Sequence, residues 1–122
     1  MRLNELAGEP FISFRIGSRL RELLDLGAAQ AGFEPRITLE SNESRRIRSL
    51  VSGGVGVAIL PRSDAGGPGA PVAIVRLVEP ELRRDVSLAS RARRRHSPAA
   101  TAFLALTRRV YEPREPPAII EA

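Results

Sequence analysis

Two short polar segments carry residue types that can hold a small anion. Hydroxyl and amide groups donate hydrogen bonds, and a guanidinium pairs with a carboxylate through two parallel bonds. The candidate ligand-binding residues are Ser13, Phe14, Arg15, Ile16, Gly17 and Ser18 in the first segment, and Glu40, Ser41, Asn42, Glu43 and Ser44 in the second. Spacing alone favours a simpler interpretation for Ser18 and Asn42, in which they cap helices, and for Arg15 it leaves a carboxylate partner and a solvated side chain equally open.

Other chemistry has little support in the residues. Glu40 and Glu43 could serve a small hydrolase or transferase, but a strand end and a first helical turn explain them more simply. The chain has one histidine, His96, and no cysteine, which argues against a transition-metal site. The glycines of 53–56 follow a predicted helix and precede an apolar strand. A dinucleotide-binding turn has the opposite order, with its glycines after a strand and before a helix. We therefore expect no enzyme, no metal and no cofactor.

Positive charge raises a nucleic-acid alternative. The net charge is +5, the pI is about 11.3, and the densest basic cluster lies at 91–95. All 19 basic residues are arginine, which is typical of coding bias, and the cluster lacks interleaved aromatic residues. A solvated loop is the favoured interpretation, and a small basic nucleic-acid-binding protein stays an alternative.

The elements that position these residues alternate between strand and helix. Strands are expected at 11–14, 37–39 and 55–60, with one helix from Ser18 to Gly32 and another from Ser41 or Asn42 to about 53. The run 55–60 is apolar throughout, as in a strand buried on both faces of a parallel α/β sheet. Both polar segments then follow strands at one edge of the sheet, where such folds bind ligands.

The second half of the chain is less regular. Breaker residues at 64–71 predict an exposed loop, and apolar runs predict strands at 72–78 and 86–89. Ser97 and Pro98 begin a helix whose apolar face ends near Val110. The tail 112–122 is expected to be disordered.

Several of these segments, in this order and spacing, resemble the effector-binding domain of LysR-type transcriptional regulators. The resemblance runs from about residue 6 to 110, and the segments that carry it are 9–14, 17–21, 31–37, Glu40, 51–61, 97–100 and 103–104. It implies an α/β fold like that of type 2 periplasmic binding proteins, with one lobe nearly complete plus the return segment of the other lobe. It also implies that the two polar segments line the effector cleft.

The resemblance divides the chain into four parts. Residues 1–10 would be a lead-in and hinge, 11–78 the second lobe, 79–111 the return strand and closing helix of the first lobe, and 112–122 a disordered tail. A family member would open with a winged helix-turn-helix, which this segment is expected to lack. We expect a cytoplasmic sensing module for a small-molecule effector, an anion for example, without direct DNA contact by this segment.

Two further expectations concern partners. An incomplete first lobe would leave apolar surface exposed, which favours a homo-oligomer. No run is long enough for a membrane span or a signal peptide, which argues against the remaining alternative, an exported solute-binding protein of the same architecture.

Overall fold

The computed structural model describes residues 1–111, so the tail predicted at 112–122 lies outside the described residues. The chain divides into two compact units, Met1–Val86 and Ser87–Ala122. We call them the first and the second unit and describe each by itself. The predicted assignment of residues to two lobes stays a prediction.

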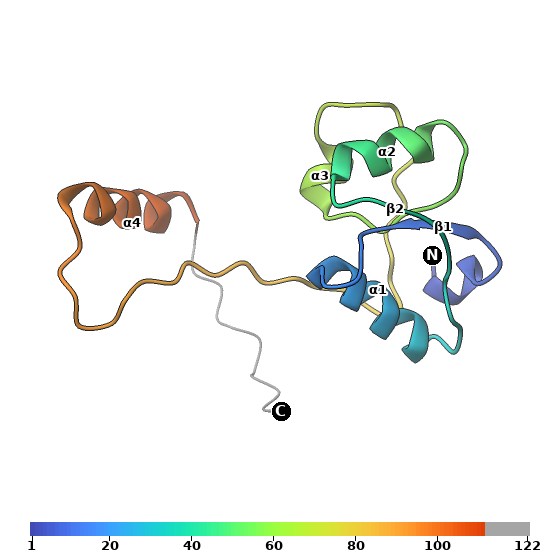
Figure 1. The fold of residues 1–122 in the computed structure, drawn as a ribbon, viewed down its shortest axis with the longest axis horizontal. Helices are drawn as coiled ribbons and strands as arrows, with labels where there is room; N and C mark the ends of the chain where they lie inside the picture. The colour runs from blue at the N-terminus through green and yellow to red at the C-terminus, as the bar shows by residue number, and fades with distance from the viewer. Residues whose placement is uncertain (112–122) are drawn as a thin grey trace. The chain divides into compact units, whose positions relative to one another are not determined.

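A small parallel sheet lies at the centre of the first unit (Figure 1). In it β1 (Pro10–Ser13) pairs with β2 (Arg36–Glu40), and the helix α1 (Arg19–Gln30) connects the two strands in the chain. The register shifts between Phe11 and Ile12, and the hydroxyl of Thr38 donates to the carbonyl oxygen of Phe11 at 3.3 Å. This β-α-β order is the predicted one, and it brings the carboxyl ends of β1 and β2 to the same edge.

The core lies on both faces of β1. Ile12 and Phe14 are buried against Ile47 of α2 (Ser44–Ser52). Alternation along the strand turns Phe11 to the other face, where its ring centroid lies 6.4 Å from that of Phe33. Figure 1 shows α1 and α2 on opposite sides of the strands, as a doubly covered sheet requires.

The predicted limits of α1 are confirmed. The hydroxyl of Ser18 accepts the N–H of Leu20 at 3.3 Å, so Ser18 is the N-cap. Ala31 ends the helix, and Gly32 follows with φ at +85°, a conformation that glycine adopts without a steric cost. Leu24 and Ala28, on the predicted apolar face, are buried.

The prediction of a fully buried strand at 55–60 is wrong. Only Val57 pairs with β1: its N–H donates to the oxygen of Pro10 at 2.9 Å, and its oxygen accepts the N–H of Ile12 at 2.8 Å. Residues 56–60 are half-buried, and Val55 is 42% exposed. Ala58 and Leu60 still pack against the core, so the segment covers the edge of β1 without extending the ladder.

Two further predictions in the first unit are wrong. The breaker-rich stretch expected as a loop at 64–71 begins inside a short helix, α3 (Arg62–Gly66). The run 72–78 forms no strand, and most of its residues are exposed. An apolar run becomes a strand only beside a partner segment, and within the described residues this run bonds to one only near its end, where Arg76 and Val78 meet Met1.

Backbone hydrogen bonds join the two ends of the first unit. The terminal ammonium of Met1 donates to the oxygen of Arg76 at 3.2 Å, and the N–H of Val78 donates to the oxygen of Met1 at 3.1 Å. Leu3, which begins the 3-10 helix η1 (Leu3–Leu6), donates its N–H to Glu79 at 2.9 Å and is fully buried.

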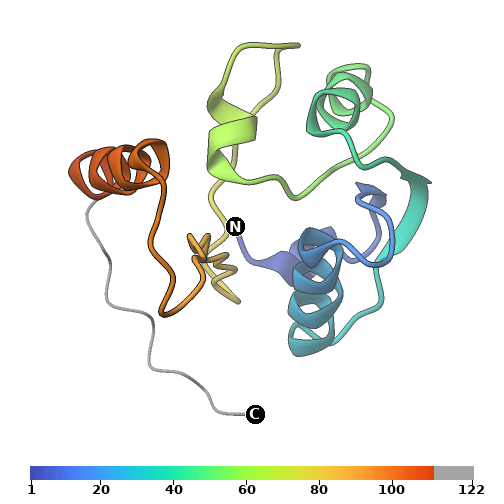
Figure 2. The same cartoon turned by 60° about the vertical axis from the view of Figure 1, so that its left-hand side comes forward.

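The second unit contains α4 (Pro98–Val110), which begins as predicted. Ser97 is its N-cap, and the serine hydroxyl accepts the N–H of Ala100 at 3.1 Å. The return strand predicted at 86–89, within 79–111, is wrong: Val86 is 83% exposed, and Figure 2 shows no strand between α3 and α4. In the described part of the chain these residues lack a neighbouring strand to pair with. No helix there is long and apolar enough to cross a membrane.

Candidate functional site

The two polar segments meet at the carboxyl edge of the sheet. We call residues 13–18 the first site loop and residues 40–44 the second site loop. The N–H of Ser41 donates to the carbonyl oxygen of Ser13 at 3.0 Å, and the side-chain oxygen of Asn42 accepts the N–H of Arg15 at 3.2 Å. Two residues of the second loop thus fix the path of the first.

The first site loop turns from the core to the solvent. Ser13 and Phe14 are buried, and the hydroxyl of Ser13 donates to the oxygen of Phe14 at 3.0 Å. Arg15 and Ile16 are exposed, Ile16 by 82%. Gly17 has φ at +96°, which lets the chain turn into the cap at Ser18. The hydroxyls of Ser13 and Ser18 are therefore both hydrogen-bonded within the protein.

The second site loop is tied down by its serines. Ser41 is buried, and its hydroxyl accepts the N–H of Glu43 at 3.1 Å. Ser44 donates its hydroxyl to the carboxylate of Asp64 at 2.5 Å. Asn42 is exposed, and its bond to the first loop leaves the NH2 group of its amide to donate.

The helix predicted to begin at Ser41 or Asn42 begins at Ser44, two or three residues later. Its N-cap is Glu43, whose side chain makes no capping bond. The side chain of Asn42 joins the two loops instead, and that of Ser41 bonds within its own loop, so the interpretation of Asn42 as a helix cap is wrong.

The loss of the one confirmed cap at this site has a measurable cost. Replacing Ser18 by alanine should lower the free energy of unfolding by about 1 kcal/mol, because the N–H of Leu20 loses its acceptor. Urea denaturation followed by circular dichroism measures this. Ser52→Ala, at the exposed end of α2, is the control and should change the value by less than about 0.5 kcal/mol. Equal changes would contradict the role of the cap.

Sequence reasoning missed two arginines that anchor loops, and the first of them holds the site from outside it. Arg21 of α1 donates to the carboxylate of Glu40 at 2.7 Å and to the oxygen of Phe14 at 3.3 Å. The hydrogen bond with Glu40, more than any other contact, raises the pKa of the Arg21 guanidinium. The spacing of Arg21 and Asp25, four residues apart on a helix, was the available signal.

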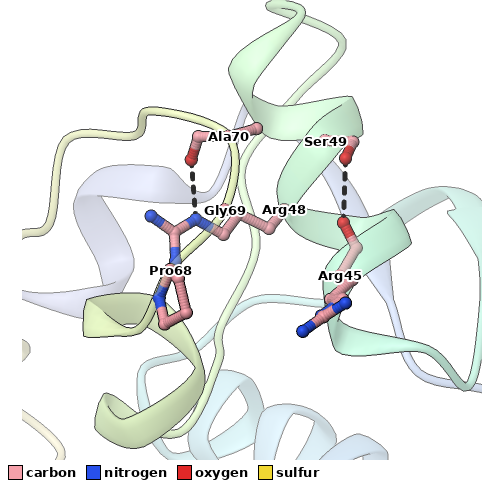
Figure 3. A pocket seen from close by; sticks show the side chains of 6 residues that line it. All are labelled: Arg45, Arg48, Ser49, Pro68, Gly69 and Ala70. Carbon is pink, nitrogen blue, oxygen red and sulfur yellow. Dashed lines mark hydrogen bonds between the residues drawn. The ribbon is translucent and has the colours of Figure 1, made fainter.

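The second arginine, Arg48 of α2, anchors the loop after α3. Its Nε donates to the backbone oxygen of Ala70 at 2.7 Å. Its Nη1 donates to the backbone oxygens of Gly67 at 2.5 Å and of Asp64 at 3.2 Å. Arg48 lines a pocket of about 290 Å³. Figure 3 shows its lining residues, which are Arg45, Arg48, Ser49, Pro68, Gly69 and Ala70. None of the predicted site residues lines this pocket.

A second pocket, of about 300 Å³, lies against α1 and the turn that follows it. Its lining residues are Arg21, Asp25, Ala29, Phe33, Glu34 and Pro35. The site loops themselves form a surface of exposed polar groups over a buried floor. Among residues 1–111 no group of three or more histidines or carboxylates could hold a metal.

The chain matches the family model of the LysR substrate binding domain over residues 1–112. It is 34% identical over 101 residues to the HTH-type transcriptional regulator YybE of Bacillus subtilis, covering 83% of this chain and 34% of YybE. It is 31% identical over 104 residues to the transcriptional dual regulator GltC of the same organism, covering 84% and 35%. The chain thus spans about a third of these relatives.

A solved structure extends the comparison to the fold. The effector-binding domain of QuiR in complex with shikimate superimposes with a TM-score of 0.75 at 31% identity, over 89% of this chain and 52% of that one. The fold is therefore the predicted α/β type, like that of the periplasmic binding proteins. With most of its length matched, the chain belongs to the LysR substrate-binding domain family.

Proposed function

We propose that the site loops form one wall of an effector site that binds a small carboxylate. The observation that carries the proposal is the contact between the loops, from the N–H of Ser41 to Ser13 and from the N–H of Arg15 to Asn42, which brings the exposed residues Arg15 and Asn42 together. A structural relative that holds shikimate, itself a carboxylate, supports the class of ligand.

The charges of the loops fit this ligand. The guanidinium of Arg15 has no hydrogen bond or ion pair to another described residue, so it can pair with a carboxylate through two bonds. The amide of Asn42 is bonded to the backbone of Arg15, and its NH2 group can donate a further bond. Glu40 is paired with Arg21, which weakens its repulsion of an anion.

The role of the whole protein follows from the family. We propose that the intact protein is a cytoplasmic transcriptional regulator, whose effector-binding part senses its ligand without chemical turnover. This segment would act without a cofactor, a membrane or direct contact with DNA. The exposed apolar residues Phe103 and Leu106 of α4 support self-association, and a homo-oligomer is part of the proposal.

A titration of the ¹⁵N-labelled chain with shikimate, followed by two-dimensional NMR, tests the site. We expect the amide signals of the two site loops to move together, with a Kd of about 1 mM or weaker, because exposed loops bury little of a ligand. Acetate, the simplest carboxylate here, should move the same signals less.

Replacing Asn42 by alanine should weaken the response to shikimate at least about fivefold, through the loss of one donor and of the contact between loops. Asn4→Ala, an exposed asparagine in η1, is the matched control and should leave the titration unchanged. If neither carboxylate moves the signals of the site loops, the proposal is wrong.

A further inference from the structure

One arginine touches both site loops and the helix between them. Arg21 lies in the first turn of α1, with a side chain only 13% exposed. Its Nη1 donates to the backbone oxygen of Phe14 in the first loop and to the carboxylate of Glu40 in the second. Its Nε donates to both carboxylate oxygens of Asp25, each at 3.1 Å.

The shape of the guanidinium makes this arrangement rigid. Its donors lie in one plane in a fixed fork, so the positions of three acceptors are set together. The side chains of Asp25 and Glu40 are 48% and 40% exposed, whereas that of Arg21 is 13% exposed. Two of the acceptors, Phe14 and Glu40, stand at the points where the site loops leave β1 and β2.

We propose that Arg21 is a positioning residue of the site, acting through Phe14 and Glu40 to hold the two loops at the spacing that the bond between Asn42 and Arg15 requires. The expected effect of Arg21 on ligand binding rests on the proposed function. Without Arg21, Glu40 would also lose its partner and stand as a free carboxylate beside the proposed anion site.

Amide hydrogen exchange of the full chain separates positioning from general stability. In Arg21→Met the amides of Arg15 and Ser41, which bond between the loops, should exchange at least about tenfold faster. The amide of Ile12, bonded to Val57 in the centre of the sheet, should change by less than about twofold. Local loosening of the loops gives this selective pattern.

Two variants complete the experiment. Arg19→Met is the matched control, since Arg19 is on the same turn, 70% exposed, and paired only with Glu22; it should leave all three amides unchanged. Arg21→Lys keeps the charge and the fold but loses the planar fork, and should speed loop exchange by about threefold. Uniform acceleration of all amides, or none, in both Arg21 variants would overturn the inference.

A titration with shikimate distinguishes this inference from the proposed function. If the wild-type chain responds to shikimate, Arg21→Met should weaken the response at least about tenfold, the combined effect of a displaced loop and an unpaired Glu40. An unchanged response would overturn the positioning role. Absence of binding to the wild-type chain contradicts the proposed function, while the exchange pattern still decides the role of Arg21.

Discussion

Replacing Gly56 by alanine is expected to lower the free energy of unfolding by about 2–4 kcal/mol. A Cβ at this position would overlap the carbonyl oxygen of Pro10 and lie 3.1 Å from its carbonyl carbon. The neighbouring bonds of Val57 to β1 hold both backbones in place, so neither can withdraw without losing them. The clash is with backbone atoms, which yield far less than the end of a side chain.

Gly53→Ala is the matched control for this substitution. There a Cβ would lie 3.5 Å from the oxygens of Leu50 and Ser49, which is ordinary contact, and φ is −77°. Alanine should be tolerated at this site, with a change of less than about 1 kcal/mol in either direction. Urea denaturation of both variants measures the difference, and coincident midpoints would show that the approach of 55–60 to β1 is not tight.

Replacing Ile47 by alanine should cost about 2–5 kcal/mol, because this fully buried side chain fills the space between α2 and β1. Its loss leaves a cavity against Ile12 and Phe14. Ile47→Val, which removes one methyl group, should cost about 0.5–1.5 kcal/mol. Thermal and urea melts measure both values.

The exposed Ile16 of the first site loop provides the control. Ile16→Ala removes the same atoms from a side chain that is 82% exposed, and should change stability by less than about 0.5 kcal/mol. A similar loss in Ile16→Ala and Ile47→Ala would mean that the core is not organised around α2.

Local signals predicted the limits of α1 and the start of α4. The caps at Ser18 and Ser97 and the glycine after α1 are chemistry within a few residues, and each appears in the structure. The edge where the two site loops meet followed from the β-α-β order alone. What the loops do to each other did not follow, because the bond from Asn42 to Arg15 joins residues 27 apart in sequence.

Errors arose where structure depends on distant partners. The run 55–60 is apolar enough for a buried strand, but its burial depends on neighbours that the sequence does not specify. Breaker residues at 64–71 led to the prediction of a loop in place of α3. Two residues of α2, Ser44 and Arg48, stabilise α3 through hydrogen bonds to Asp64. The strand expected at 86–89 needed a partner strand that the described residues do not offer.

The bonds between residues 1–3 and 76–79 have a kinetic consequence. They join Met1 to Arg76, 75 positions away, and so close the chain between these residues into a ring without a covalent link. Closing a loop of that length costs about 4 kcal/mol of chain entropy beyond the constant term, whereas β1, α1 and β2 meet within a short stretch. We expect the ring to close after the folding barrier is crossed, so that weakening it speeds unfolding and leaves the folding rate nearly unchanged.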